Sequence, residues 1–216
     1  MVLIPPSENG GVAAGALKRK PVPMALLDWT RIDPMYRLSG DGVLLRPPQT
    51  SDFQAWRDLR AASRDDLQPW EPVWPVDDLT RIGFRRRMSA YQRDLDLGLG
   101  YAFFVFRKSD EALVGGVALS NVRRGIAQTA SLGYWAGKPY LRRGHTLAGV
   151  KAVLAFAQKP LGLHRVEAAC LPTNIASGCL LIKAGFKEEG YAPAYLKING
   201  EWRDHRLFGL ILGEEI

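Results

Sequence analysis

A strand that runs into a basic, glycine-containing loop and then a helix is the segment best suited to hold an anion. It covers residues 134–148, with the sequence YWAGKPYLRRGHTLA. A helix start exposes backbone N–H groups and the positive end of the helix dipole, which together bind a pyrophosphate. Arg142, Arg143 and Gly144 suit such a site, because arginine pairs with phosphate and glycine permits close backbone approach. An ordinary connection between a strand and a helix has the same pattern, so both interpretations stay open.

Two other polar groups of residues follow later in the chain. Asn174 and Ser177 lie in the first turn of an expected helix, within LPTNIASGCLL. Both residue types cap helices well, so capping and a catalytic role are equal alternatives. Asp204 and His205, in GEWRDHRLFGL, are either an acid/base pair or the solvated end of a strand.

The elements that position these residues begin with a short strand at 42–46. Capping oxygens at 50–52 precede the periodic segment FQAWRDLRAAS, which predicts a helix. A loop rich in Pro and Trp, QPWEPVWP, follows it. Asp77 and Asp78 are then expected to open a basic amphipathic helix that ends near Leu95.

The middle of the chain predicts three antiparallel strands at 101–107, 113–120 and about 129–136. A helix over 144–159 then leads to another strand at 164–171. A helix between two strands favours a crossover that joins parallel neighbours. A further helix near 174–183 and a hairpin with an Asn-Gly turn complete an α+β fold with a mixed sheet.

Composition and charge limit the class of protein. The chain has 216 residues, of which 47% are hydrophobic and 24% charged, with a formal net charge of +7. These values favour one globular domain over residues 36–216, a leader rich in Pro and Gly over 1–35, and an acidic partner. Cys170 and Cys179 are both expected in buried elements, and three scattered histidines do not suggest a metal site. The sequence thus predicts a cytoplasmic protein with no metal and no membrane span.

Residues 40–212 resemble the GNAT superfamily and, within it, the RimJ/RimL group of ribosomal-protein alanine N-acetyltransferases, with the RimJ branch nearer. The runs that carry the resemblance are LQPWEPVWP, GGVALSNVRRG, LGYWAGKPYLRRG, HRVEAACLPTNIASGCLLIKAGFKEEGY and YLKINGEWRDHRLFGL. The resemblance implies a sheet split into a V between the strands near 129–136 and 164–171. Acetyl-CoA is expected in the opening of this V.

The resemblance also assigns residues to the cofactor and to catalysis. The implied pyrophosphate loop keeps its central glycine, whereas Leu141 and Thr146 depart from the family pattern. Asn174 is expected to touch the pantetheine arm and Ser177 to lie near the sulfur. Many relatives carry a glutamate that acts as the general base where this chain has Ser131. The residues expected to bind the cofactor are Leu141, Arg142, Arg143, Gly144, His145, Thr146, Tyr134, Trp135 and Asn174.

A missing strand carboxylate favours an acceptor amine of low pKa. A protein α-amine, with a pKa near 7.7–8.0, is roughly a tenth neutral at pH 7, whereas a lysine is almost entirely charged. Glu71, or a water held near Ser131, is the expected base, and Ser177 or a water that it holds would protonate the thiolate. The aromatic side chains of Trp70, Trp74, Tyr195 and Trp202 either wall an acceptor-peptide groove or pack in the core.

The expected activity is acetylation of a protein N-terminus, first of all a ribosomal protein with N-terminal alanine. The enzyme is expected to act as a monomer or weak homodimer, without direct DNA contact. One alternative is a non-catalytic ribosome- or RNA-binding factor that uses Arg85–Arg87 and Arg123–Arg124. Another is an acetyltransferase for a small-molecule amine, which calls for acidic residues in the acceptor cleft.

Overall fold

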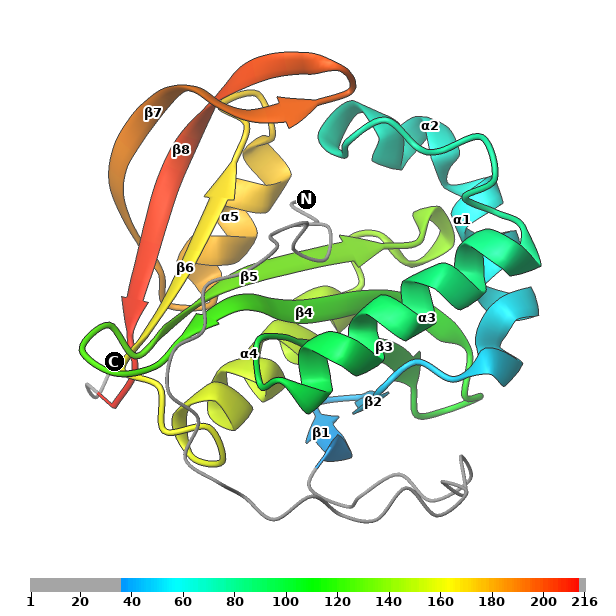
Figure 1. Ribbon diagram of the computed structural model, residues 1–216, viewed down its shortest axis with the longest axis horizontal. Coiled ribbons are helices and arrows are strands. Elements are labelled where there is room, and N and C mark those ends of the chain that lie inside the picture. Colours follow the sequence, from blue (N-terminus) through cyan, green and yellow to red (C-terminus); the bar gives the residue numbers. More distant parts are fainter. Residues whose placement is uncertain (1–35, 214–216) are drawn as a thin grey trace.

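The computed structural model describes residues 36–213, which form an eight-stranded mixed sheet with helices on both faces (Figure 1). The predicted leader, residues 1–35, lies outside the described residues. The proposed domain limits therefore stay a prediction.

The sheet is antiparallel at every pair of neighbours except one, β5 with β6. Helix α4 joins these two strands, which confirms the predicted crossover. The strands lie in the order β1-β2-β3-β4-β5-β6-β8-β7. Their bounds are β1 Leu38–Gly40, β2 Val43–Arg46, β3 Tyr101–Arg107, β4 Leu113–Arg123, β5 Thr129–Ala136, β6 Arg165–Cys170, β7 Lys187–Ile198 and β8 Glu201–Ile211.

Alternation along β3 explains why the sheet has an apolar cluster on each face, because neighbouring side chains of a strand point to opposite sides. Phe103 packs against Phe156 of α4, with ring centroids 5.4 Å apart. Phe104 joins the cluster on the other face with Trp56 of α1 and Phe84 of α3. Figure 1 shows α3 and α4 on opposite sides of the sheet. The helices are α1 Phe53–Ala62, α2 Arg64–Leu67, α3 Arg81–Asp96, α4 His145–Gln158 and α5 Ile175–Lys183.

The predicted start of α3 is wrong by one turn. Thr80 is the N-cap, and its hydroxyl accepts a backbone N–H from the first turn. Asp77 and Asp78 instead form ion pairs with Arg86 and Arg87, at 2.8 and 2.6 Å. The two carboxylates thus bind arginine side chains of α3 and leave the capping position to Thr80.

Smaller differences concern segments whose local signals are weak. Strand β1 and the four-residue helix α2, which lies between α1 and the expected Pro/Trp-rich loop, were not predicted. Cys170 is buried as expected, whereas Cys179 is exposed because it lies on the outer side of α5. Within residues 36–213, no helix combines the length and the apolar character that a membrane span needs.

The hairpin of β7 and β8 agrees with its predicted Asn-Gly turn. Asn199 and Gly200 have φ values of 46° and 88°, the left-handed backbone that these two residue types tolerate. The tip of the hairpin reaches the segment after α2, where the backbone N–H of Asn199 donates to the carbonyl oxygen of Glu71 at 2.8 Å. Figure 1 shows the hairpin curving over toward α2.

Candidate active site

The strands β5 and β6 pair only at one end and then separate. Their pairing runs from Thr129 with Arg165 to Ser131 with Glu167. Beyond Ser131 the facing edges of both strands continue without a strand partner, and Figure 1 shows the strands diverging. The unpaired edge of β5 leaves backbone N–H and C=O groups for a ligand. This geometry confirms the predicted V-shaped split.

The loop before α4 presents backbone amides to an anion. Arg142 and Gly144 both have positive φ, at 58° and 82°. The first hydrogen bond that closes α4 runs from the N–H of Ala148 to the carbonyl of Gly144 at 3.0 Å, so the preceding N–H groups lack a helical acceptor. Arg142, Arg143 and Gly144 are exposed, as is Leu141. Free amides, a helix dipole and two arginines at one point fit a diphosphate.

His145 and Thr146, the first residues of α4, are partly buried. The ring of His145 lies 6.5 Å from that of Tyr140, measured between centroids. Its Nε2 atom is buried and has no hydrogen-bond partner among the described residues. A polar group bound at the helix start can satisfy this nitrogen. The contact of His145 with the cofactor stays a prediction.

Tyr134 and Ser177 meet between β5 and α5. The Tyr134 hydroxyl lies 2.6 Å from Ser177 Oγ and also donates to the Ser177 carbonyl at 3.2 Å. Both side chains are buried. Burial raises the pKa of Tyr134 far above its usual value, so this hydroxyl stays protonated at neutral pH. The pair can therefore hold or deliver a proton within the V.

Asn174 caps α5. Its Oδ1 accepts the backbone N–H of Ser177 at 3.1 Å, and its side chain is buried. Capping therefore explains Asn174, and a contact to a pantetheine arm stays a prediction. Cys170, at the end of β6, is also buried close to Ser177, and burial raises the pKa of its thiol.

Glu71 lies in a buried ion pair, which argues against its predicted role as the general base. Arg60 binds both carboxylate oxygens, at 2.8 and 2.6 Å, and Trp74 Nε1 donates to one of them at 2.7 Å. The guanidinium of Arg60 also lies over the Trp74 ring, 4.2 Å from its centroid. Because these donors occupy both carboxylate oxygens and the side chain is buried, an acceptor amine cannot reach it. The contacts favour a role for Glu71 in holding this segment.

The remaining predicted substrate residues, and the predicted cofactor residue Trp135, divide between the surface and the core. Tyr195 and Trp202, on the hairpin, expose 47% and 64% of their surface, so they can contact an acceptor. Trp70 is partly buried and packs against the cluster of α1 and α3. Trp135 is buried in that cluster, so any contact it makes with a cofactor must come from its backbone. Ser131 lies, partly buried, where β5 and β6 separate.

Glu167 is a polar residue of this region that the sequence analysis missed. It is the register partner of Ser131 and bonds with Arg123 and Arg165, at 3.2 and 3.1 Å. A single carboxylate inside the apolar run VEAAC is the signal that could have identified it.

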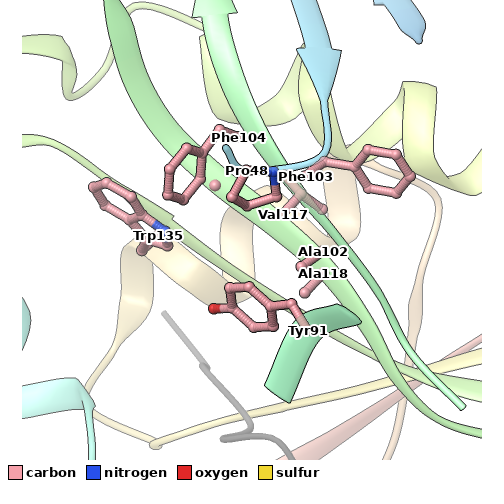
Figure 2. A pocket seen from close by; sticks show the side chains of 9 residues that line it. Pro48, Tyr91, Ala102, Phe103, Phe104, Val117, Ala118 and Trp135 are labelled. Atoms are coloured by element: carbon pink, nitrogen blue, oxygen red, sulfur yellow. The ribbon is translucent and has the colours of Figure 1, made fainter. Parts of the chain in front are cut away.

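A small apolar pocket lies elsewhere, between α3 and the sheet (Figure 2). Tyr91 of α3 and Trp135 of β5 border it, together with Phe104 and Pro48. Tyr91 is its only titratable lining residue, so the pocket offers little for acyl transfer. Among residues 36–213, no three His, Cys, Asp or Glu side chains form a group that could hold a metal ion, and the expected absence of a metal stays a prediction.

Comparison with known proteins agrees with this geometry. The model of the acetyltransferase (GNAT) domain family matches residues 43–187. The [Ribosomal protein uS5]-alanine N-acetyltransferase of Escherichia coli is 34% identical over 82% of this chain and 91% of its own length. The structure of Mycobacterium smegmatis RimJ in complex with CoA-disulfide has 30% identity and a TM-score of 0.77, covering 82% of this chain and 87% of that one.

A second solved structure, the ribosomal-protein-S5-alanine acetyltransferase from Vibrio fischeri, has 29% identity and a TM-score of 0.76. It covers 82% of this chain and 97% of its own. The chain therefore belongs to the GNAT acetyltransferase family and is an N-acetyltransferase. Within the family, it is similar to proteins of the RimJ/RimL group of ribosomal-protein alanine N-acetyltransferases.

Proposed function

We propose that the enzyme transfers an acetyl group from acetyl-CoA to the N-terminal α-amine of a protein, with a ribosomal protein that begins with alanine as the first candidate. The observation that carries this proposal is the meeting, at one V, of an unpaired β5 edge, the amides before α4 and the Tyr134–Ser177 pair. The similarity to enzymes named for ribosomal protein S5 supports the acceptor class.

Residues of this chain can supply three requirements of thioester aminolysis: a bound donor, a polarised carbonyl and a proton for the leaving sulfur. Arg142, Arg143 and the amides before α4 would hold the diphosphate of acetyl-CoA, which supplies the activated acetyl group. Backbone amides on the free edge of β5 can polarise the acetyl carbonyl. The hydroxyl of Ser177, backed by that of Tyr134, can protonate the departing sulfur.

We infer the class of acceptor from the residues that stand where a general base is expected. Ser131 replaces the strand carboxylate of many relatives, and the carboxylate of Glu71 is bound by Arg60. An α-amine suits such a site, because roughly a tenth of it is already neutral at pH 7, whereas a lysine side chain needs strong deprotonation. A cytoplasmic enzyme, either monomeric or weakly dimeric, is consistent with this acceptor and remains part of the proposal.

Two measurements test the function in sequence. Acetyl-CoA is expected to raise the melting temperature, because a ligand at 100 times its Kd adds about 2.7 kcal/mol to the free energy of unfolding. Ribosomal proteins are then incubated with enzyme and labelled acetyl-CoA, and their peptides are analysed by mass spectrometry. Label on an N-terminal amine supports the proposal. Label on lysines alone, on small amines alone, or on nothing despite donor binding contradicts it.

Gly144→Val is expected to weaken acetyl-CoA binding about tenfold. Valine resists positive φ, at a cost of roughly 1–3 kcal/mol, and part of the cost appears as displaced amides before α4. Gly125→Val is the matched control, because Gly125 also has positive φ, at 69°, and an added Cβ meets nothing within 4 Å at either position. Titration of acetyl-CoA by calorimetry checks this prediction. Equal affinity in both variants would show that the amides before α4 do not hold the donor.

A further inference from the structure

The positive charge of the protein is concentrated in one part of the fold. From Lys138 to Lys183 the sequence has seven Lys or Arg residues and a single acidic residue, Glu167. The net charge of this segment is therefore +6, compared with +7 for the whole chain. The segment forms the loop before α4, the helix α4, the strand β6 and the helix α5. Neither helix contains an Asp or a Glu.

Most of these cations have no acidic partner. Lys138 pairs with Asp66, with their charged atoms 3.1 Å apart, and Arg165 pairs with Glu167 and Glu189. Five cations of the segment are exposed and form no ion pair with any residue of 36–213, namely Arg142, Arg143, Lys151, Lys159 and Lys183. Unpaired cations on a surface attract an anion more strongly than paired ones do.

Three of the five cations lie beyond the expected diphosphate site at the start of α4. Lys151 and Lys159 are eight residues apart on the exposed side of α4, which is roughly 12 Å along the helix axis. Lys159 follows the last turn, roughly 20 Å from the helix start. Lys183 is the last residue of α5. These three residues, which we call the lysine surface, are too widely spread for one diphosphate and suit an extended polyanion.

The lysine surface covers one side of the sheet (Figure 1). Helices α4 and α5 bury their inner residues, such as Val150 and Leu181, in the same apolar cluster, so their exposed sides both turn away from the sheet. The two helices expose no Phe, Tyr or Trp on which an unpaired base could stack. Contacts from lysines alone suit phosphates of a duplex, whose bases are already stacked and paired.

The arginines considered earlier for RNA binding are largely engaged with other groups. Arg86 and Arg87 form ion pairs with acidic residues, and Arg123 pairs with Glu167. Arg124 donates to the backbone carbonyl of Leu161. The sequence therefore pointed to clusters of arginine that the fold has largely neutralised, whereas the scattered lysines of α4 and α5 stay unpaired.

We propose that the lysine surface binds the phosphate backbone of a double-stranded RNA segment. The choice of RNA rests on the proposed function, because a ribosomal protein as acceptor lies beside ribosomal RNA. Tyr195 and Trp202, which can contact an acceptor, belong to the β7–β8 hairpin and stay free when RNA covers α4 and α5. Bound RNA would raise the local concentration of acceptor N-termini around the enzyme.

Binding of a labelled RNA duplex of about 20 base pairs, followed by fluorescence anisotropy, tests this surface. Saturating coenzyme A is present throughout, so that the donor site does not contribute. If three phosphates are neutralised, the affinity should fall roughly tenfold to twentyfold between about 50 and 150 mM KCl. The triple variant Lys151→Gln/Lys159→Gln/Lys183→Gln should bind at least about tenfold more weakly at 50 mM KCl and lose most of this salt dependence.

The matched control removes the same charge from other surfaces. Arg37→Gln/Arg85→Gln/Lys197→Gln changes three exposed residues outside α4 and α5, none of which forms an ion pair within residues 36–213. Its RNA affinity should stay within about twofold of the wild type. A loss in both triple variants would mean that only net charge matters, and a loss in the control alone would place RNA elsewhere. Either result overturns the inference.

The wild type provides the remaining outcomes. Absence of RNA binding at 50 mM KCl contradicts the proposal, as does tighter binding of a DNA duplex of the same sequence or of phosphatidylserine vesicles. Both triple variants should keep the wild-type melting temperature and affinity for acetyl-CoA, because the changed side chains are exposed. RNA binding is measured without acetyl transfer, so its failure leaves the proposed function intact. An enzyme that binds RNA but leaves N-terminal peptides unmodified would instead contradict the proposed function alone.

Discussion

Glu71→Gln is expected to lower the free energy of unfolding by about 3–5 kcal/mol. The substitution keeps the shape of the side chain but leaves the guanidinium of Arg60 buried without its counter-ion, and breaking such a pair costs this much. Arg60 and Glu71 expose only 3% and 2% of their side chains, so water cannot replace the lost contact. Thermal unfolding measures the effect, at about 2–4 °C per kcal/mol for a chain of this size.

Asp77→Asn is the control, because Asp77 also forms a bidentate contact with an arginine, Arg86, but on the surface. Its melting temperature should equal that of the wild type, since exposed ion pairs contribute little. Glu71→Gln should also leave the shape of the kcat–pH profile unchanged below its melting temperature. A lost acidic limb at normal stability would restore Glu71 as the base.

Local sequence patterns predict those parts of the fold that a single strand or turn determines. A continuous apolar run predicts β3, and the Asn199-Gly200 pair sets the hairpin turn. The extent of the V could not be predicted in this way, because it depends on where two strands separated by α4 stop pairing. Asp77 and Asp78 show a second limit. Their carboxylates pair with arginines one to two turns into α3 and do not cap the helix. This choice depends on side-chain geometry, which the spacing of residues in the sequence does not show.

The candidate site likewise has residues that local patterns predict and contacts that they do not. Gly144 and Asn174 carry local signals, and both lie where the sequence predicts. The contact of Tyr134 with Ser177 joins residues 43 positions apart, and no local pattern encodes it. Glu71 is buried as the partner of Arg60, which precedes α2. The residue expected to be the base therefore forms an ion pair, and no local pattern indicates this.

Ser177→Ala is expected to lower kcat by about a hundredfold while the KM for acetyl-CoA changes little. General acid catalysis contributes about 10²–10⁴-fold, and a thiol with a pKa near 8.5 leaves readily enough to place this case at the lower end. The fold should persist, because the Tyr134 hydroxyl retains the carbonyl of residue 177 as an acceptor, and the cap from Asn174 uses only the backbone N–H. Steady-state kinetics with an N-terminal peptide measure both constants.

Tyr134→Phe separates a proton donor from a mere packing contact. If Ser177 delivers the proton and Tyr134 orients its hydroxyl, Tyr134→Phe lowers kcat less than Ser177→Ala, and the double variant is no slower than Ser177→Ala alone. Groups that act as one unit are non-additive in this way. Fully additive losses would mean that the two hydroxyls act on different steps. A large rise in KM for acetyl-CoA in Ser177→Ala, with kcat unchanged, would instead make Ser177 a binding group, and the proton for the sulfur would have to come from water.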